Sequence, residues 1–185
     1  KLIRKLHLPK KYNEASSEET KKGIVLDVEA TGLSIGHDDV IQLALLPFDY
    51  EVTSGRIINI NKDQAFNGMR EPRVPISEEA SLITGITNEM VLNKKIDSKS
   101  VEAIIENTDL VIAHNAAYDR PMVEQHWDCF KTVSWACTFR SINWLKEGFS
   151  SAKLELLGLN YGWFYEGHDA FNDCEACLAL LSETL

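Results

Sequence analysis

The sequence predicts a single α/β domain in which a mixed β-sheet is flanked by helices. Three observations support this fold class. The apolar segments follow the order βββαβαβα, which is typical of a sheet covered by helices. The length of 185 residues suits one domain of roughly 100–200 residues. The composition, 44% hydrophobic and 25% charged, is that of a globular protein and excludes a disordered chain.

The first part of the sheet is expected to be a three-stranded antiparallel meander. The strands are predicted over residues 23–29, 40–48 and 55–61, which are rich in aliphatic and β-branched side chains. Thr31-Gly32 interrupts the first run. Residues 62–76 contain one glycine and two prolines, so this stretch is predicted to be a loop.

The second part of the chain alternates helices with parallel strands. Helices are predicted over 77–83, 100–107, 117–127, 151–162 and 168–185, and strands over 109–115 and 133–139. The segment 133–139 reads equally well as a junction between a strand and a helix. Ser77 and Ser100 are the expected N-caps of the first two helices, and Gly85 is the expected end of the first.

Charge divides the chain into a basic leader and an acidic domain. Residues 1–22 hold seven Lys or Arg and three acids, so their net charge is +4. Because the whole chain has a net charge of −9, residues 23–185 have a net charge of −13. We predict that residues 1–22 are a flexible or loosely attached leader, either a solvated tail or an arm for nucleic acid or a protein partner. The acidic remainder argues against duplex DNA gripped along many phosphates.

The chain shows no signal for a membrane or for secretion. No apolar run reaches the roughly 18–20 residues that span a bilayer, and the start of the chain lacks the apolar stretch of a secretory signal. Four cysteines are few for this length, which predicts a reduced, cytoplasmic setting. The chain begins at Lys1, so further segments can precede it.

Two acidic residues end the first predicted strand. Alternate residues of a strand share a face, so Asp27 and Glu29 should lie side by side with Val25. Two adjacent carboxylates on an apolar strand repel each other and are costly to desolvate, and a divalent cation removes both problems. The alternative is an exposed pair at the edge of the sheet.

Three more residues complete a candidate site. Asp119 follows the strand predicted over 109–115, at a junction where functional groups of α/β proteins gather. His168 precedes the last predicted helix and Asp173 lies in its first turns. Taken singly, Asp119 could be a residue favoured by the helix dipole, and His168 a capping or packing residue.

Together these motifs resemble a known enzyme family. The pattern D-x-E-x-T-G from Asp27, H-N-A-A-Y-D ending at Asp119, and H-x-x-x-x-D from His168 to Asp173 are similar to the DEDDh 3′→5′ exonucleases of the DnaQ-like branch. The resemblance runs from about Gly23 to the end of the chain. It is strongest to bacterial exonucleases similar to the proofreading epsilon subunit of DNA polymerase III. It implies a ribonuclease H-like fold.

The resemblance also implies a reaction. Asp27, Glu29, Asp119 and Asp173 would hold two divalent ions, Mg²⁺ or Mn²⁺, which prefer hard carboxylate ligands. His168 would act as the general base, since an imidazole titrates near neutral pH. The enzyme would release 5′-mononucleotides from the 3′ ends of mainly single-stranded DNA.

Three other functions remain open at this point. The enzyme could act on RNA or oligoribonucleotides, because recognition of the 2′-hydroxyl depends on fine geometry. It could be a proofreading subunit bound to a polymerase. It could also be a silent nucleic-acid-binding module, although such a module has no need of all five site residues.

Five residues are expected to contact the substrate. Thr31 and the backbone N–H groups from Gly32 onward could hold the terminal 3′-hydroxyl, and Tyr118 could stack on a base. Leu33 could wedge against the last base or pack in the core. Thr84 stands where the epsilon-like pattern often has His, so affinity or nucleotide preference can differ there.

Several other features are assigned to structure rather than function. Cys174 and Cys177 are expected to pack within the last helix rather than bind zinc. Asp38-Asp39 is expected to be a solvated turn, and His126 carries no signal.

The overall acidity predicts a weak, non-processive grip on a few nucleotides.

Overall fold

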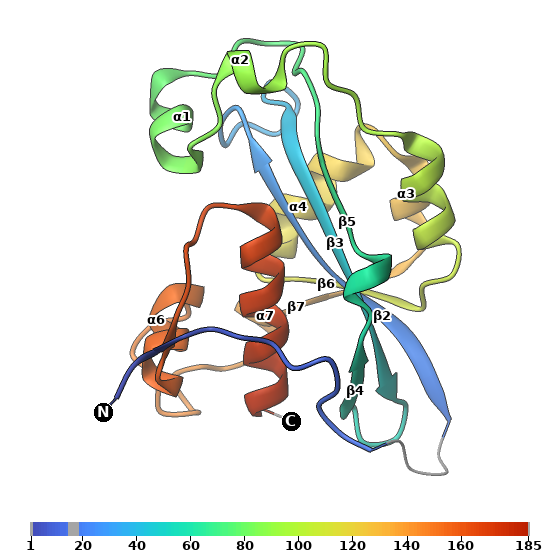
Figure 1. Ribbon diagram of the computed structural model, residues 1–185, viewed down its shortest axis with the longest axis vertical. Coiled ribbons are helices and arrows are strands. Elements are labelled where there is room, and N and C mark those ends of the chain that lie inside the picture. The colour runs from blue at the N-terminus through green and yellow to red at the C-terminus, as the bar shows by residue number, and fades with distance from the viewer. Residues whose placement is uncertain (1, 15–18, 185) are drawn as a thin grey trace.

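The computed structural model describes residues 2–14 and 19–184 (Figure 1). A six-stranded mixed sheet forms its centre, with the order β4-β3-β2-β6-β7 and with β5 also paired to β3. The strands of this sheet are β2 (Thr20–Ala30), β3 (Val40–Glu51), β4 (Ile57–Ile60), β5 (Phe66–Met69), β6 (Leu110–Ala113) and β7 (Ser134–Cys137). The predicted α/β class is therefore confirmed.

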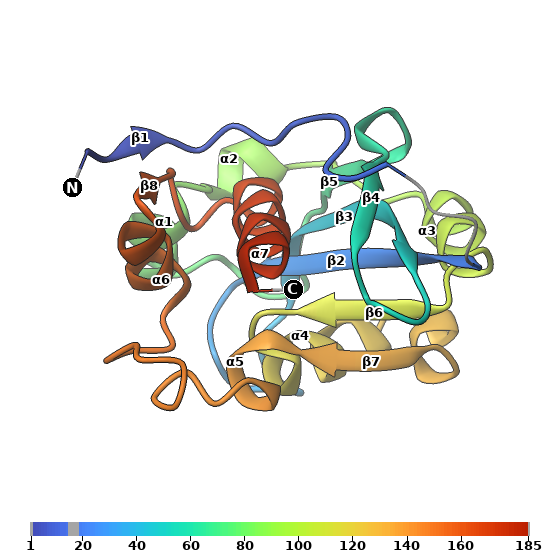
Figure 2. The same ribbon diagram turned by 90° about the horizontal axis from the view of Figure 1, so that it is seen from below.

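Helices cover the sheet from both sides. The α-helices are α1 (Glu78–Thr84), α2 (Asn88–Val91), α3 (Ser98–Ile105), α4 (Ala116–Glu124), α5 (Thr138–Ser141), α6 (Leu154–Tyr161) and α7 (Ala170–Thr184). Figure 2 shows α7 on one side of β2 and α4 on the other. Short 3₁₀ turns lie at Lys62–Gln64 and Asp128–Lys131. No helix among the described residues is long and apolar enough to cross a membrane.

The alternation along β2 follows from this two-sided cover. Val25 packs with α7 in one core cluster, whereas Ile24 and Leu26 pack with α3 and α4 in a second cluster on the opposite face. A strand covered on both faces reads as a nearly continuous apolar run, as residues 23–28 do. Asp27 and Glu29 share their face with Val25, which is the face that α7 covers.

The antiparallel meander differs from the predicted one by an additional strand. β3 has 12 residues and pairs with β4 near its end and with β5 along Gln42–Leu45. β5 lies in the segment 62–76 that was predicted to be a loop. The prediction was wrong there because the long edge of β3 has backbone groups to pair, which the glycine and prolines of the segment do not reveal.

The predicted helix caps are partly confirmed. The Ser77 hydroxyl accepts a hydrogen bond from the Ala80 N–H, and Gly85 ends α1 with φ +69°. The N-cap of α3 is Asp97, whose carboxylate accepts from the Ser100 N–H, so the prediction of Ser100 as the cap was wrong. Asp97 is the better cap because its carboxylate also accepts from the Ser100 hydroxyl at 2.6 Å.

The described part of the leader lies along the domain. β1 (Arg4–Lys5) pairs in parallel with β8 (Trp163–Phe164), and Lys11 forms an isolated bridge with Asn59. β2 itself begins at Thr20, within the predicted leader. The predicted leader also includes residues 1 and 15–18, which lie outside the described residues. The boundary at residue 22 stays a prediction.

Candidate active site

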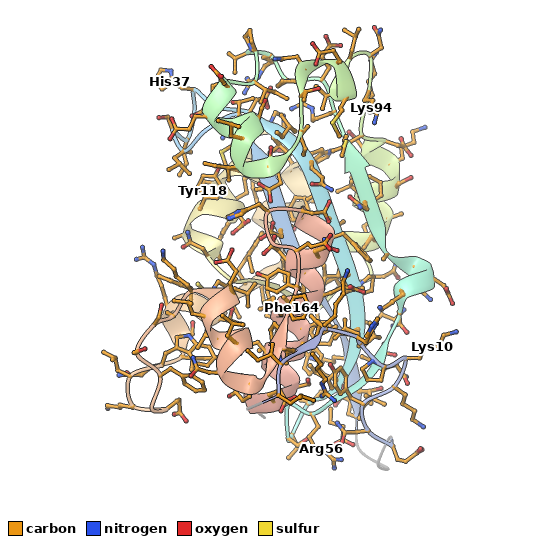
Figure 3. All side chains as sticks on the ribbon, turned by 60° about the vertical axis from the view of Figure 1, so that its left-hand side comes forward. Lys10, His37, Arg56, Lys94, Tyr118 and Phe164 are labelled. Carbon is orange, nitrogen blue, oxygen red and sulfur yellow. The ribbon has the colours of Figure 1, made fainter. Side chains whose placement is uncertain are left out.

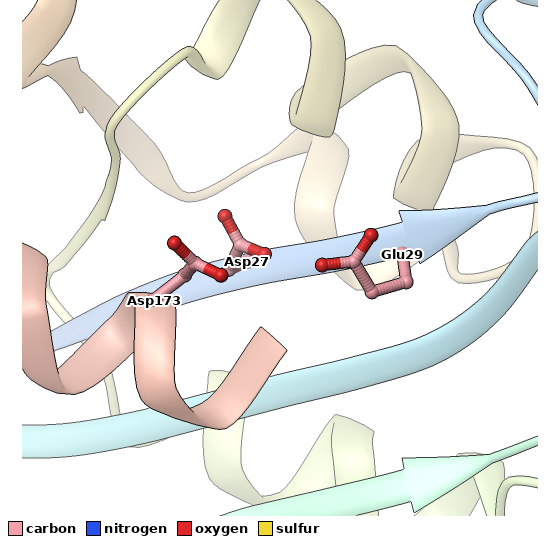
Figure 4. Close-up of side chains that lie close together, drawn as sticks. All are labelled: Asp27, Glu29 and Asp173. Atoms are coloured by element: carbon pink, nitrogen blue, oxygen red, sulfur yellow. The ribbon is translucent and has the colours of Figure 1, made fainter. Parts of the chain in front are cut away.

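Three carboxylates meet where α7 begins above β2. Asp27 and Glu29 extend from β2, and Asp173 extends from the first turn of α7 (Figure 4). Ligand oxygens of the three residues all lie within 4.8 Å of one another. The alternation of side chains along β2 places Asp27 and Glu29 on one face of the strand. The packing of α7 on β2 adds Asp173, which is 144 positions after Glu29 in the sequence.

The cysteines of α7 help to seat this helix. Cys174 and Cys177 are both buried. The Cys174 thiol donates a hydrogen bond of 3.4 Å to the Val25 carbonyl oxygen. The Cys177 sulfur lies 3.6 Å from the Thr138 hydroxyl. All four cysteines of the chain are free. The C-x-x-C therefore packs α7 against the sheet, next to Asp173.

The carboxylates are poorly suited to carry their charges without a counterion. Burial, and then repulsion from neighbouring carboxylates, raises the pKa of Glu29 to about 8 and the pKa of Asp27 well above its ordinary value. Burial is also the main cause of the raised pKa of Asp173. A group of buried or partly buried carboxylates within 4.8 Å of one another is a donor set that fits a hard divalent cation.

Asp119 borders the same cavity from a different element. It lies in the first turn of α4, is 3% exposed, and accepts a hydrogen bond at 3.3 Å from the Val28 N–H. Burial raises its pKa to about 7, against the opposing effect of that N–H. Asp119 lines a cavity of about 450 Å³ with Asp27, Glu29 and Asp173, but it is outside the group of three within 4.8 Å.

His168 lies on the loop that leads into α7. Its backbone has φ +64°, which is uncommon for a residue other than glycine, and its side chain lines the same cavity. Its Nε2 lies 3.4 Å from Glu155 Oε1. The next residue, Asp169, holds the loop because its carboxylate accepts from the Asn172 N–H and from the buried Gln42 side chain. The imidazole is thus on the cavity wall where the motif predicts it.

Sequence reasoning missed Tyr165 as a member of the site. Its hydroxyl donates a hydrogen bond of 2.8 Å to Asp173 Oδ1, and burial together with the Asp173 charge raises the pKa of Tyr165. Lys153 and Glu155 also line the cavity from the start of α6. The sequence analysis did not predict that Lys153 and Glu155 line this cavity.

The five predicted substrate residues share a second cavity. It measures about 530 Å³ and is lined by Thr31, Gly32, Leu33, Thr84 and Tyr118, together with Glu29 and His168 from the first cavity. The Tyr118 hydroxyl donates to the Gly32 carbonyl at 2.8 Å. Leu33 is 84% exposed, so the core-packing alternative for this residue is wrong. Their contacts with a nucleotide stay a prediction.

The expectation of a solvated turn at Asp38-Asp39 was wrong. Asp38 Oδ1 accepts from the Thr31 hydroxyl at 2.9 Å, and that hydroxyl in turn accepts from the Asp39 N–H at 3.0 Å. Asp39 itself is fully buried and forms ion pairs with Arg70, Arg73 and His126. All three partners lie far along the chain, so local sequence gave no sign of the cluster.

The fold and the acidic site together define a nuclease of ribonuclease H-like architecture. The sequence profile of the exonuclease family (RNase_T) matches residues 24–181. The chain therefore belongs to this family, within the DnaQ-like 3′→5′ exonucleases, a group of hydrolases.

Individual relatives agree with this membership. The DNA polymerase III PolC-type protein of Bacillus cereus is 34% identical over 121 residues, which is 60% of this chain and 7% of that protein. The structure of an Exonuclease X complex with 5′-overhanging duplex DNA is 25% identical, with a TM-score of 0.63 over 87% of this chain and 89% of the other. A structure of E. coli Exonuclease I with an oligonucleotide is 20% identical, with a TM-score of 0.61 over 89% and 40%, and shows likeness of fold.

Removal of divalent metal is expected to make the stability of the fold depend on pH. The folded metal-free protein has pKa values of about 8 for Glu29 and about 7 for Asp119, whereas unfolded carboxyl groups titrate near 4. The folded state then keeps protons that the unfolded chain releases. The free energy of unfolding from these groups is therefore greatest at low pH and falls as the pH rises from about 4 to about 8.

Thermal unfolding in EDTA and in Mg²⁺ checks this. We expect the midpoint in EDTA to fall between pH of about 6 and about 8.5, and Mg²⁺ to raise the midpoint more at the higher pH, where protons no longer compete for the carboxylates. A midpoint difference between EDTA and Mg²⁺ that is the same at both pH values would contradict the prediction.

Proposed function

We propose that this protein hydrolyses phosphodiester bonds from the 3′ ends of single-stranded DNA and releases 5′-mononucleotides. The observation that carries the proposal is the junction of two cavities. The carboxylate cavity of about 450 Å³ adjoins one of about 530 Å³, and the two share Val28, Glu29, Tyr118 and His168. A terminal nucleotide in the second cavity would present its phosphate to the carboxylates of the first.

The proposed cofactors are two divalent ions, Mg²⁺ or Mn²⁺. Asp27, Glu29 and Asp173 would hold them, with Asp119 completing the ligand set from α4. When bound, such ions stabilise the charge that develops on the attacking and leaving oxygens. The Tyr165 hydroxyl donates to one oxygen of Asp173 and so fixes the orientation of this carboxylate.

His168 is the proposed general base. It stands on the cavity wall outside the carboxylate group and is about half exposed, so it can take a proton from the attacking water and pass it to solvent. Glu155 Oε1, 3.4 Å from the imidazole Nε2, would help to orient the ring. The positive φ at this residue sets the direction of the side chain.

The pocket for the terminal nucleotide has its own proposed contacts. The Thr31 hydroxyl is bonded to Asp38 and to the Asp39 N–H, which leaves its second acceptor lone pair for the 3′-hydroxyl. The exposed side chain of Leu33 would lie against the terminal base, and Tyr118 would stack on a base. Gly32 makes room for the Asp38 carboxylate, because a Cβ there would lie 2.6 Å from an Asp38 oxygen.

Digestion of end-labelled oligonucleotides tests the proposed function. With Mg²⁺, we expect a 5′-labelled single strand to shorten in a ladder and a 3′-labelled strand to release its label at once as a mononucleotide. EDTA should stop both. Persistence of cleavage in EDTA, or release of the 5′ label first, would refute the proposal. Matched single-stranded DNA, duplex DNA and RNA in parallel determine the preferred substrate.

Replacement of His168 by Ala is expected to lower kcat by about 10²–10⁴-fold, the usual contribution of a general base. KM should change little, because the carboxylates that hold the metal ions remain. The pH profile of kcat should also lose the limb that reports deprotonation of the general base. A full rate for His168→Ala at neutral pH would show that another group accepts the proton. His7→Ala, outside the site, serves as the matched control.

A polymerase context is a second proposal. The chain covers only 7% of the length of the PolC-type relative, whose name describes a DNA polymerase. Proofreading for such an enzyme would need a partner or further domains. Co-purification with a polymerase, and a faster removal of mismatched than matched 3′ ends, would support it. A cytoplasmic setting remains part of the proposal.

A further inference from the structure

We propose that the protein has a second anion site, which binds the phosphate group of a nucleotide away from the catalytic carboxylates. The site is a cavity of about 520 Å³ between the end of β5, the start of α3 and the end of α4. Its charged lining consists of Arg70, Arg73, Lys94, Lys95, His126 and Glu71. None of its lining residues is shared with the two cavities of the candidate active site.

The first argument is the excess of positive charge in a concave place. Two arginines and two lysines line the cavity, against one lining acid, Glu71. The carboxylate of Glu71 accepts from the Asn93 N–H at 2.9 Å. Like charges around a hollow repel each other, and a bound anion relieves this repulsion. The gathering stands out because the whole chain carries a net charge of −9.

The second argument is that a buried carboxylate holds the arginines in place from behind. Asp39 Oδ1 accepts from Arg70 Nη1 at 2.7 Å and lies 2.6 Å from His126 Nε2. Asp39 Oδ2 accepts from both the backbone N–H and the Nε of Arg73, at 2.8 and 3.1 Å. These contacts fix the arginine side chains before any ligand arrives, which lowers the entropy cost of binding.

The third argument concerns the donors that remain. Within the described residues, the Asp39 contacts use Nη1 of Arg70 and Nε of Arg73, so the Nη groups of Arg73 stay available. The Arg73 side chain is 60% exposed, while the Arg70 side chain is 20% exposed. The Arg73 guanidinium is therefore accessible to a ligand, whereas Arg70 forms part of the cavity wall.

The donor chemistry favours phosphate. Guanidinium groups bind phosphate oxygens through paired N–H groups, and lysines add point charges. A volume of about 520 Å³ falls in the range of sites for small molecules and matches a mononucleotide rather than a bare ion. The phosphate can come from a free 5′-mononucleotide or from the backbone of a bound strand. An acidic peptide is the competing ligand class.

Binding measurements in EDTA test this site. Without metal, the catalytic carboxylates repel phosphate, so calorimetry with 5′-dAMP, inorganic phosphate and a ten-nucleotide single strand reports on the basic cavity. We expect binding by the wild type and at least a tenfold weaker affinity for the double variant Arg73→Gln/Lys95→Gln, which removes two charge-assisted contacts. The indole N–H signal of Trp127, which donates to Ser98 at the cavity wall, should shift on titration.

A matched variant controls for the loss of charge. Lys10→Gln/Arg56→Gln removes the same two charges at residues that lie at the other end of the molecule from Lys94 (Figure 3). It should bind as the wild type does. Arg73→Lys, which keeps the charge but loses the fork, should bind with intermediate affinity, and unfolding curves verify that each variant is folded.

The outcomes separate the sources of the phosphate. Binding of 5′-dAMP that the double variant weakens identifies a free nucleotide as ligand. Weakened binding of the single strand alone identifies a backbone phosphate. The proposal is overturned if no phosphate compound binds, if the double variant binds them as tightly as the wild type, or if only a glutamate-rich peptide binds.

Discussion

An Asp27→Asn protein is expected to lose at least about 10³-fold of its exonuclease rate, because it loses several kcal/mol of metal-dependent stabilisation of the transition state. The change is nearly isosteric. It replaces a charged oxygen at the centre of the carboxylate group by an amide that binds divalent cations poorly. The pKa of Asp27 is raised well above its ordinary value by burial and by Asp119, Asp173 and Glu29.

The same change should stabilise the metal-free fold at neutral and higher pH. Asparagine has no charge to desolvate and does not repel its neighbours, so the midpoint of thermal unfolding in EDTA should rise. Asp128→Asn, at a side chain that is 90% exposed, is the matched control and should leave rate and midpoint unchanged. An Asp27→Asn protein that keeps its rate, or that unfolds more readily in EDTA, would contradict the assignment of this residue.

The second large effect is expected at Asp39. Asp39→Ala should lower the free energy of unfolding by about 3 kcal/mol, since removal of one partner of a buried ion pair leaves an uncompensated charge. The loss falls at the lower end of the usual range because the Arg73 side chain is 60% exposed and can regain water. Urea denaturation with an unchanged m-value would measure the effect.

The pH dependence of the wild type gives an independent test of Asp39. Burial raises its pKa, but the backbone and side-chain hydrogen bonds from Arg73 and the charge of Arg70 outweigh this, so the net pKa lies below its ordinary value. A lowered folded pKa contributes stability above the unfolded value near 4 that is lost as the pH falls through the folded pKa. Wild type and Asp39→Ala should therefore converge in stability in acid. Asp128→Ala, in contrast, should stay within about 0.5 kcal/mol of the wild type throughout.

The carboxylates of the candidate site were predictable because each belongs to a local pattern. The period of two along a strand places Asp27 and Glu29 on one face whatever the rest of the fold does. Asp173 lies in the first turn of α7, and His168 precedes it at a fixed spacing. The spacing of these motifs was enough to indicate the exonuclease family, which the match over residues 24–181 confirms.

The residues that the sequence did not reveal act through partners far along the chain. Tyr165 joins the site only because β8 and α7 bring its hydroxyl to Asp173. β5 forms because β3 is long enough to offer a second stretch of edge, a property of the partner strand rather than of residues 66–69. Local composition, which indicated a loop at residues 66–69, cannot predict the contact of Tyr165 with Asp173 or the pairing of β5 with β3.

Asp39 shows most clearly where sequence and tertiary structure divide. The sequence by itself determined the strand alternation, most of the strands and helices, and the residue types of a candidate metal site, since these follow from contacts within a few residues. Only the tertiary structure decided that Asp39 is buried, because its ion-pair partners Arg70 and Arg73 lie 31 and 34 positions further along. From the sequence alone, Asp39 beside Asp38 is expected to be solvated. In the folded protein, packing excludes water from Asp39 and places Arg70 and Arg73 against it as counterions, and the same packing forms the basic cavity.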